Sequence, residues 1–358
     1  MVQLKTTSLR TPLYAEHLAL GAKLVDFGGW EMSLYYSSVT GEHMAVRKYA
    51  GIFDVSHMGR IEVMGRDAES LLDFLSTACI AGKKEGSAVY TVWCNEQGFA
   101  IEDLIVYRLN QEKFFVVANA ANRETVLQHL LNHAKGKEVR ILPHFHDAGI
   151  LAIQGPQAIE KMAFYLPGIE KLQAMRCGRF LCGNETVIAA RTGYTGSGGI
   201  EVFGSGKAVK QIWQEGLAKG IQPAGLGARD TLRLEMGYAL YGHELTRAIA
   251  PIESVAAWTV KTQHEFMGKK ALLDLLGKPH RQQKGIIVQK GIAREGSLLF
   301  CGDELVGVVT SGTFSPILGK GIAIAMFNRP LADSETLQVQ IRQELVPAAL
   351  SDLPFVHL

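Results

Sequence analysis

Two adjacent acids, Glu102 and Asp103, open an apolar run near the end of the first third of the chain. The pattern predicts a strand over 101–108 and a second over 113–119, which ends in Asn119, an uncharged donor and acceptor. Because neighbouring side chains on a strand point to opposite faces, one acid would face solvent and the other whatever the sheet covers. A carboxylate at the entrance to a core strand costs free energy unless it is paired or used, so the position allows a structural or a catalytic role.

The densest glycine cluster, residues 193–199, carries Tyr194 and is followed by Glu201. No Lys-Ser/Thr pair follows at the spacing of a phosphate-binding loop, which excludes that motif. One interpretation is a β-turn with an exposed tyrosine. The other is a site where glycines let the backbone approach a flat ligand, with Tyr194 stacking on it and Glu201 accepting its hydrogen bonds.

Two cations, Arg229 and Arg233, lie one turn apart on a helix expected to open near Gly225. The glycines there form an incomplete dinucleotide-binding fingerprint, because the third glycine and the preceding parallel strand are missing. The arginines suit either exposed pairing with acids such as Glu235 or, for Arg229, clamping of a carboxylate at the helix start.

Two histidines, His144 and His146, would lie on one side of a strand, as metal ligands sometimes do. The sequence offers no convincing third ligand at metal-site spacing, so structural histidines are favoured over a metal-dependent hydrolase. The pair Ser56-His57 and the later His243 lack the G-x-S-x-G elbow of a serine nucleophile, which argues against that chemistry.

The 358 residues are 47% hydrophobic and 20% charged, which predicts two or three globular domains. A net charge of +2, without a cluster of basic residues interleaved with aromatics, argues against a nucleic-acid partner. The five cysteines are scattered and lack a C-x-x-C pair, which favours reduced thiols. The chain has no apolar signal region at its start and no stretch of ~18 uncharged apolar residues, so we expect a cytoplasmic protein without a membrane partner.

The expected elements fall into three groups. Residues 50–140 give two strands, a helix, three strands and a helix, which indicates an antiparallel α+β unit. The pattern restarts after residue 138 with further strands and then two helices over 208–219 and 228–237. A polar linker over 275–285 precedes segments of strand and turn, which predicts an all-β C-terminal domain.

With these pieces in order, the sequence resembles the aminomethyltransferase of the glycine cleavage system, the T-protein family. The resemblance runs from Thr11 almost to the C-terminus, and the order of its motifs makes it specific. It is carried by TPLYAEHLALGAKLVDFGGWEM, GIFDVSHMG, NEQGFAIEDLIVYR, QGPQA, RTGYTGSGGIEVF, GLGARDTLRLEMGYALYGHEL, PIESVAAWTV and VGVVTSGTFSP.

The resemblance implies an α+β, three-domain cloverleaf with antiparallel sheets and tetrahydrofolate in its central hole. Domain 1 would be a discontinuous folate-binding domain from residues 1–49 plus 141–275. Domain 2 would be an inserted ferredoxin-like α+β domain at 50–140, and domain 3 a C-terminal all-β barrel at 283–358.

The implied reaction starts from an aminomethyl group on the lipoyl arm of a partner, the lipoylated H-protein. Ammonia leaves and the one-carbon unit passes to the co-substrate tetrahydrofolate, giving 5,10-methylenetetrahydrofolate; no metal and no flavin are expected. By resemblance, Asp103 is the acid near the folate N5, Glu201 binds the pterin and Arg229 binds the benzoyl-glutamate tail. The expected pocket wall comprises Met58, Tyr107, Asn119, Tyr194 and Trp258.

The chain departs from the family pattern at three positions: Glu102 replaces an aspartate, Phe99 a glycine and Ser33 a proline. We expect the change at Glu102 to be peripheral, because the second acid is kept.

The main competing function is that of a folate-binding relative in iron–sulfur cluster maintenance or tRNA modification, but such proteins carry a Lys-Gly-Cys motif that is absent near residues 225–245. Folate domains of dimethylglycine- and sarcosine-oxidising enzymes are fused to flavin domains, for which this chain is too short.

Overall fold

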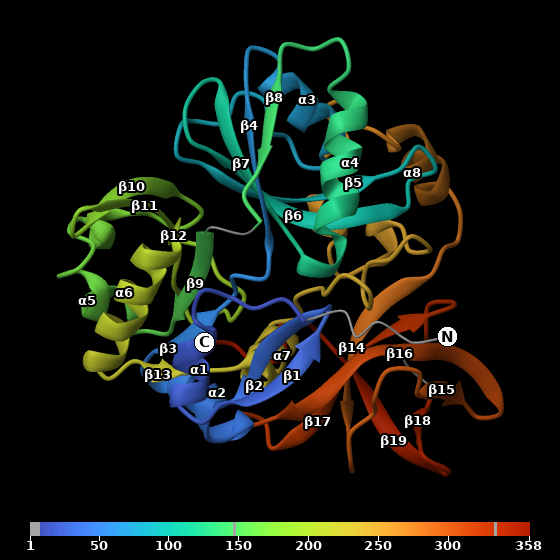
Figure 1. Cartoon of the computed structure of the whole chain (residues 1–358). Helices are drawn as coiled ribbons and strands as arrows, with labels where there is room; N and C mark the ends of the chain where they lie inside the picture. The colour runs from blue at the N-terminus through green and yellow to red at the C-terminus, as the bar shows by residue number, and fades with distance from the viewer. Residues whose placement is uncertain (1–7, 146–147, 333–334) are drawn as a thin grey trace, which may run out of the picture.

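The computed structural model describes residues 8–145, 148–332 and 335–358. It forms three lobes, and helix α7 (Leu226–Glu235) lies between them near the centre of Figure 1. The expected α+β class with three lobes and a C-terminal barrel is therefore confirmed.

The first lobe is built on a six-stranded sheet with the order β10-β11-β12-β9-β3-β13. Its neighbours are antiparallel except β13 and β3, which run parallel. Helix α6 buries Val209, Ile212 and Trp213 against this sheet, the face that its helical spacing predicts. The bounds are β3 Gly51–Asp54, β9 Ala148–Gln154, β10 Cys177–Cys182, β11 Glu185–Ala190, β12 Gly199–Ser205, β13 Gln222–Pro223, α5 Ala158–Met162 and α6 Gly206–Ala218.

The N-terminal segment lies across the start of α7. The hairpin of β1 and β2 packs on α7 through β2, and helix α2 packs beside it. Ser38 caps α2 by accepting a hydrogen bond from the backbone N–H of Gly41 at 3.1 Å. The bounds are α1 Tyr14–Ala19, β1 Lys23–Phe27, β2 Trp30–Tyr35 and α2 Val39–Lys48.

The second lobe is a five-stranded antiparallel sheet with the order β5-β6-β7-β4-β8. Four of these strands with helices α3 and α4 have the βαββαβ order of a ferredoxin-like unit, and β5 adds an edge strand beside β6. The amphipathic α3 buries Leu71, Leu72 and Leu75 against the sheet. The bounds are β4 Gly59–Met64, α3 Ala68–Leu75, β5 Ala88–Cys94, β6 Ala100–Arg108, β7 Lys113–Ala118, α4 Arg123–His133 and β8 Arg140–Pro143.

The structure differs from the expected borders of the inserted unit. Strand β3 pairs with β9, with Asp54 opposite Leu151, so it belongs to the first lobe although it was expected to open the second. Strand β8 pairs with β4 and belongs to the second lobe. From the sequence, a new group of strands, outside the inserted unit, is instead expected to begin before this strand. Local periodicity identifies a strand but not the sheet it joins. We propose that the inserted domain spans residues 59–143.

The third lobe is a closed barrel with the order β14-β17-β16-β15-β18-β19. It begins at Gln282, inside the expected linker, and that linker is preceded by helix α8 (Lys269–Leu276), which the periodicity did not predict. Closure of the sheet leaves no free edge strand. The bounds are β14 Gln282–Val288, β15 Leu298–Cys301, β16 Glu304–Ser315, β17 Lys320–Phe327, β18 Leu337–Ile341 and β19 Glu344–Ser351.

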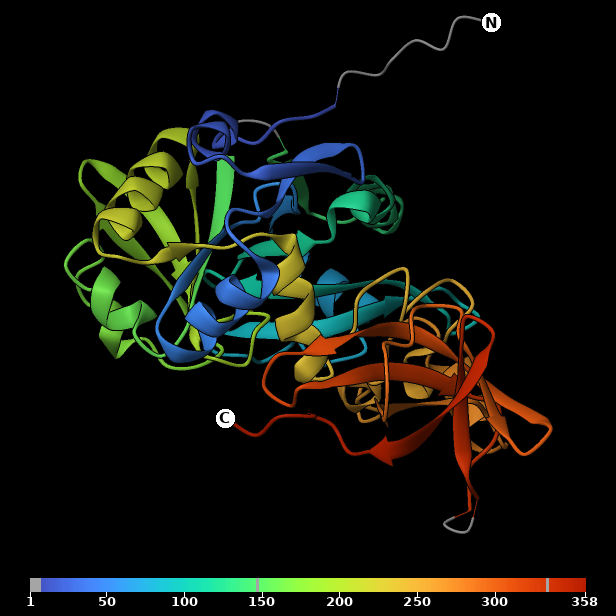
Figure 2. The same ribbon diagram turned by 90° about the horizontal axis from the view of Figure 1, so that it is seen from below.

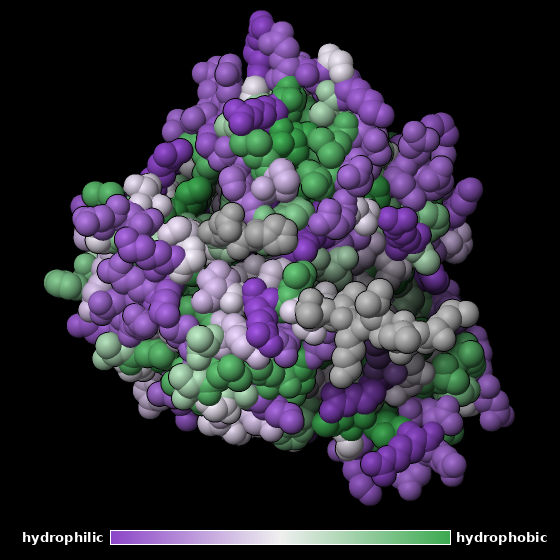
Figure 3. All heavy atoms as spheres, viewed as in Figure 1, coloured by the Kyte–Doolittle hydropathy of each residue, from purple (hydrophilic) through white to green (hydrophobic). Residues whose placement is uncertain are grey.

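Residues 236–268, the connecting segment, join α7 to α8 and contact the second and third lobes. Leu245 and Phe266 of this segment pack with Val92 and Ala100 of the inserted sheet. Its short 3₁₀ turn Pro251–Glu253 packs on β14. Seen from below, the barrel and the first lobe lie on opposite sides of α7 (Figure 2). Hydrophobic and hydrophilic residues alternate in small patches on the face shown in Figure 3.

Candidate functional site

Glu102 and Asp103 are both buried, with 0% and 8% of their surfaces exposed. The expectation that one of them faces solvent is wrong, because the lobes cover both faces of β6. The Tyr90 hydroxyl donates to Asp103 Oδ2 at 2.9 Å. The Asn119 side-chain amide donates to Glu102 Oε1 at 2.7 Å and to Asp103 Oδ1 at 3.2 Å, so it bridges the two acids.

Burial favours the neutral form of both carboxyl groups, but to different extents. It raises the pKa of Asp103 to about 6. Burial and the neighbouring charge of Asp103 raise the pKa of Glu102 well above its ordinary value. Two adjacent carboxylates resist double ionisation, and the larger upward shift falls on Glu102, so Asp103 is the acid that ionises first as the pH rises.

Glu201 lies on β12, with 8% of its surface exposed. Its Oε2 accepts hydrogen bonds from the hydroxyls of Thr192 at 2.5 Å and Tyr107 at 3.4 Å. Tyr107 belongs to the apolar cluster between the two sheets, against which Met58 packs. Two hydroxyl donors therefore hold the Glu201 carboxylate in a fixed orientation.

Tyr194 of the glycine-rich loop at residues 193–199 contacts Arg229 of helix α7. The guanidinium carbon of Arg229 lies 4.7 Å from the centre of the Tyr194 ring. The Tyr194 hydroxyl donates to the carbonyl of Ala239 in the connecting segment. Burial raises the pKa of Tyr194, and the charges of Asp103 and Arg229 act on it in opposite directions, which places the ring within electrostatic reach of both.

Trp258, with 61% of its surface exposed, stacks on Tyr90 with the ring centres 5.6 Å apart. Tyr90 thereby links this exposed indole to Asp103. Among the residues expected from the sequence, Asp103 and Asn119 share hydrogen bonds, as do Tyr107 and Glu201. Burial lowers the pKa of Arg229, and the nearby Glu201 and Tyr194 oppose that effect, so Arg229 lies close to the second of these groups.

Sequence reasoning missed Tyr90 and Thr192, the hydroxyl donors to the two site carboxylates. In the ladder between β5 and β6, Val92 lies opposite Asp103, so Tyr90, two residues earlier, is a diagonal neighbour on the same face. That signal becomes visible only once the register is known. Thr192 precedes Tyr194 by two residues, inside the motif already identified.

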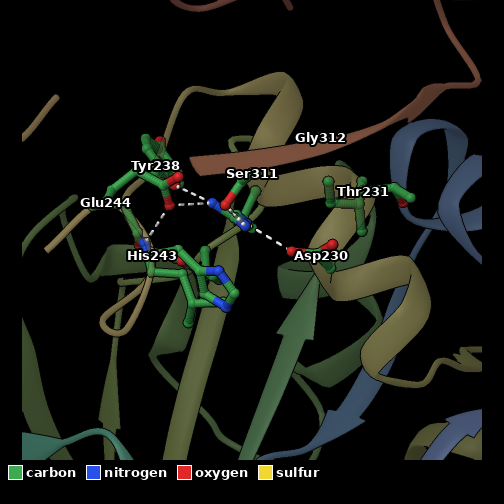
Figure 4. Close-up of polar contacts among 12 residues, drawn as sticks. Asp230, Thr231, Tyr238, His243, Glu244, Ser311 and Gly312 are labelled. Atoms are coloured by element: carbon green, nitrogen blue, oxygen red, sulfur yellow. Dashed lines mark hydrogen bonds and ion pairs between the residues drawn. The ribbon is translucent and has the colours of Figure 1, made fainter. Parts of the chain in front are cut away.

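Arg233 does not make the exposed pair with Glu235 that was considered. It is 2% exposed and donates to Glu244 and to Asp230, each at 2.8 Å, and to the Ser311 hydroxyl at 2.9 Å (Figure 4). Glu235 instead pairs with Arg47 at 2.7 Å. The Arg233–Glu244 pair therefore joins α7, the connecting segment and the barrel.

Other features considered from the sequence do not form a site here. His144 is exposed and donates its backbone N–H to the Arg60 carbonyl, and His146 lies outside the described residues. Among residues 8–145, 148–332 and 335–358, no three His, Cys, Asp or Glu side chains cluster as a metal site requires. Within the same ranges no helix is both long and apolar enough to cross a membrane.

Two hollows of about 550 and 500 Å³ lie beside Arg176 and Arg247 rather than at the acids.

Comparison with known proteins covers almost the whole chain. Residues 13–264 match the family model of the GCVT N-terminal domain, and residues 281–357 match that of the glycine cleavage T-protein C-terminal barrel domain. The chain is 41% identical to an aminomethyltransferase of Thermus thermophilus over 98% of this chain and 99% of the relative. It is 42% identical to one of Rubrobacter xylanophilus, over 98% and 94%.

Among solved structures, the glycine cleavage system aminomethyltransferase T from Bartonella henselae has a TM-score of 0.90 at 32% identity, covering 98% of both chains. The sequence resemblance is thus confirmed along the length of the chain, and none of these comparisons favours the iron–sulfur or tRNA alternative. The chain belongs to the aminomethyltransferase family, the T-proteins of the glycine cleavage system.

Proposed function

We propose that this enzyme, a one-carbon transferase by family, releases ammonia from an aminomethyl-lipoyl arm and transfers the methylene to tetrahydrofolate. The products would be 5,10-methylenetetrahydrofolate, ammonia and the dihydrolipoyl arm, which a lipoylated H-protein would carry. The observation that carries the proposal is the buried acid pair, in which Asp103 is ionised beside Tyr90 and Asn119.

The residues present fit a flat, polar heteroaromatic co-substrate with an anionic tail. Trp258 offers an exposed aromatic face. Glu201 is a fixed acceptor matched to the amino and ring N–H donors of a pterin. Arg229 supplies a cation next to Tyr194 that suits a carboxylate. When bound, tetrahydrofolate would supply the nitrogen nucleophile that takes the one-carbon unit.

Asp103 is the proposed catalytic residue. Its carboxylate would stabilise the positive charge that develops as ammonia leaves and would accept a proton from the reacting nitrogen, work typically worth ~10²–10⁴-fold in rate. Tyr90 and Asn119 fix its two oxygens, so little reorganisation is required during the reaction. Met58, Tyr107 and Tyr194 would form the pocket wall.

Replacement of Asp103 tests this role directly. We expect Asp103→Asn to lower methylene transfer from loaded H-protein by ~10²–10⁴-fold, because the amide can neither carry the charge nor take the proton. Tetrahydrofolate should still bind, because Glu201 and Arg229 are intact. The measurements are turnover with H-protein as donor and calorimetric folate binding.

Glu102→Gln is the matched control, because it changes the neighbouring acid, whose raised pKa favours the neutral form that glutamine resembles. We expect this variant to keep most of the turnover. Equal turnover of Asp103→Asn and wild type would refute the proposed mechanism, whereas absence of any folate-dependent transfer by the wild type would refute the proposed function.

A further inference from the structure

A water-sized internal cavity lies beneath the start of helix α7. Its volume is about 10 Å³, close to what a single water molecule needs. The polar side chains that line it are those of His17, Ser33, Tyr36, Asp54 and Arg229. It thus adjoins the arginine of the candidate site without being part of the site surface.

Two buried polar atoms on residues that line this cavity have no protein partner among the described parts of the chain. They are Arg229 Nη1, a donor, and Ser33 Oγ, which can donate and accept. A buried donor without a partner costs about 1–3 kcal/mol, so such atoms are normally satisfied by protein or by ordered water.

The surrounding hydrogen bonds leave acceptors for a bridging molecule. Although burial opposes ionisation, the His17 ring and Ser56 keep the pKa of Asp54 below its ordinary value. Asp54 accepts a hydrogen bond from His17 Nε2 at 2.8 Å, and the Tyr36 hydroxyl is hydrogen-bonded to His17 Nδ1 at 2.9 Å. The oxygen of Tyr36 keeps lone pairs, and the remaining lone pairs of Asp54 add further acceptors.

We propose that this cavity is a binding site for one structural water, which accepts from Arg229 Nη1 and donates to Ser33 Oγ. The water is the class of ligand that fits, because the space is too small for an organic anion. With a polar partner on each side, the bridge satisfies both atoms that otherwise remain unpaired.

The water makes Ser33 a positioning residue for Arg229, an inference that rests on the proposed folate role of that arginine. Arg229 lies over the Tyr194 ring, and its side chain has several rotatable bonds that a bridge at Nη1 would fix. A residue without a side-chain hydroxyl at position 33 would remove the group that receives the water.

A crystal structure of the whole protein tests the site itself. We expect one ordered water within hydrogen-bond distance of Arg229 Nη1 and Ser33 Oγ. An empty cavity, or an Arg229 Nη1 bonded directly to a protein atom, would overturn the proposal independently of any activity.

Folate binding by Ser33→Ala tests the positioning role. Loss of one hydrogen bond in the bridge should weaken tetrahydrofolate binding, so that its Kd and KM each rise by roughly 3–10-fold. The kcat should change by less than about twofold. Ser37→Ala, an exposed serine of the following loop, is the matched control and should bind as wild type does. Wild-type binding by Ser33→Ala would overturn the positioning role. Unchanged binding by Arg229→Ala would instead refute the folate role of the arginine, which separates the two failures.

Discussion

At the scale of single residues, the side-chain amide of Asn119 hydrogen-bonds to both acids of the candidate site. Asn119 bridges Glu102 and Asp103, while the Tyr90 hydroxyl binds only Asp103. Glu102 Oε1 also accepts a hydrogen bond from the backbone N–H of Asp103 at 2.9 Å, so each acid has two donors. Burial and the neighbouring charge of Asp103 raise the pKa of Glu102 further than that of Asp103, so Asp103 ionises first. Glu102 is fully buried, whereas Asp103 retains 8% of its surface exposed.

The raised pKa of Asp103 predicts a pH profile. The carboxylate is the active form, so kcat/KM should fall with unit slope as the pH drops below about 6. The residual kcat/KM of Asp103→Asn should not show this fall at acidic pH. Initial rates between pH 5 and 8 check the prediction, and a flat wild-type profile over that range would contradict it.

The same group affects stability with a defined sign. The pKa of Asp103 is higher in the folded state than its ordinary value of 3.8, so the folded protein binds the proton more tightly. Its contribution to the free energy of unfolding is therefore present at low pH and is lost as the pH rises through about 6. The stability of Asp103→Asn relative to wild type should therefore increase as the pH rises from 3.8 to about 6 and then stay constant, as urea unfolding would show.

At the scale of elements, the start of α7 is seated directly on strand β2. A Cβ on Gly225 would lie 2.5 Å from the carbonyl carbon of Leu34 and 2.7 Å from the carbonyl oxygen of Ser33. The backbone of Gly225 is extended (φ −102°), so sterics rather than strain require glycine here. Because Gly225 holds the start of α7 against β2, it also fixes the position of Arg229, which lies near the start of the helix.

Gly225→Ala should therefore lower the free energy of unfolding by ~1–3 kcal/mol through overpacking. It should also weaken folate binding, because α7 would have to move away from β2. Gly277→Ala is the control, since its Cβ would meet ordinary contacts of 3.8 Å and more. Urea unfolding and calorimetry provide the measurements, and equal stability of the two variants would contradict the steric explanation.

Local patterns in the sequence identified some elements and not others. The apolar spacing of α6 predicted that helix, because α6 buries one face against the first sheet. Helix α8 was missed because its N-cap is a left-handed glycine, Gly268, without a polar side chain to mark the start. The assignment of β3 was wrong because sheet membership depends on long-range pairing with β9.

At the scale of the whole molecule, the three lobes meet through polar contacts as well as apolar ones. Glu244 accepts from Arg233 of α7 at 2.8 Å and from Thr310 of the barrel at 2.6 Å. The connecting segment that carries Glu244 also supplies the Ala239 carbonyl to Tyr194. The position of the barrel is thus coupled to the wall of the candidate site.

Removal of one partner of this buried pair should be costly. Glu244→Ala removes the buried carboxylate partner of Arg233 and leaves only the half-exposed Asp230, so the free energy of unfolding should fall by ~3–5 kcal/mol. Asp274→Asn, which breaks the exposed pair with Lys270, should have no measurable effect. Similar losses in the two variants, measured by urea unfolding, would show that burial does not determine the cost.

The resemblance supplied the candidate residues, but their assembly comes from three distant parts of the chain. Asp103, Glu201 and Arg229 lie on the inserted sheet, on the first sheet and on α7. Composition and spacing do not specify how such elements dock, since docking depends on side-chain packing between lobes. For that reason Tyr90, Thr192 and the Arg233–Glu244 pair emerge only from the folded chain.

The inserted lobe leaves and rejoins the first sheet through two neighbouring strands, β3 and β9, and the backbone N–H of Val55 still donates to the Ile150 carbonyl at the point of departure. A protease that nicks a loop between these strands would cut the polypeptide but not the sheet. Both pieces would remain in register and share their cores. Limited proteolysis should therefore give two bands on a denaturing gel from a particle that still elutes as one.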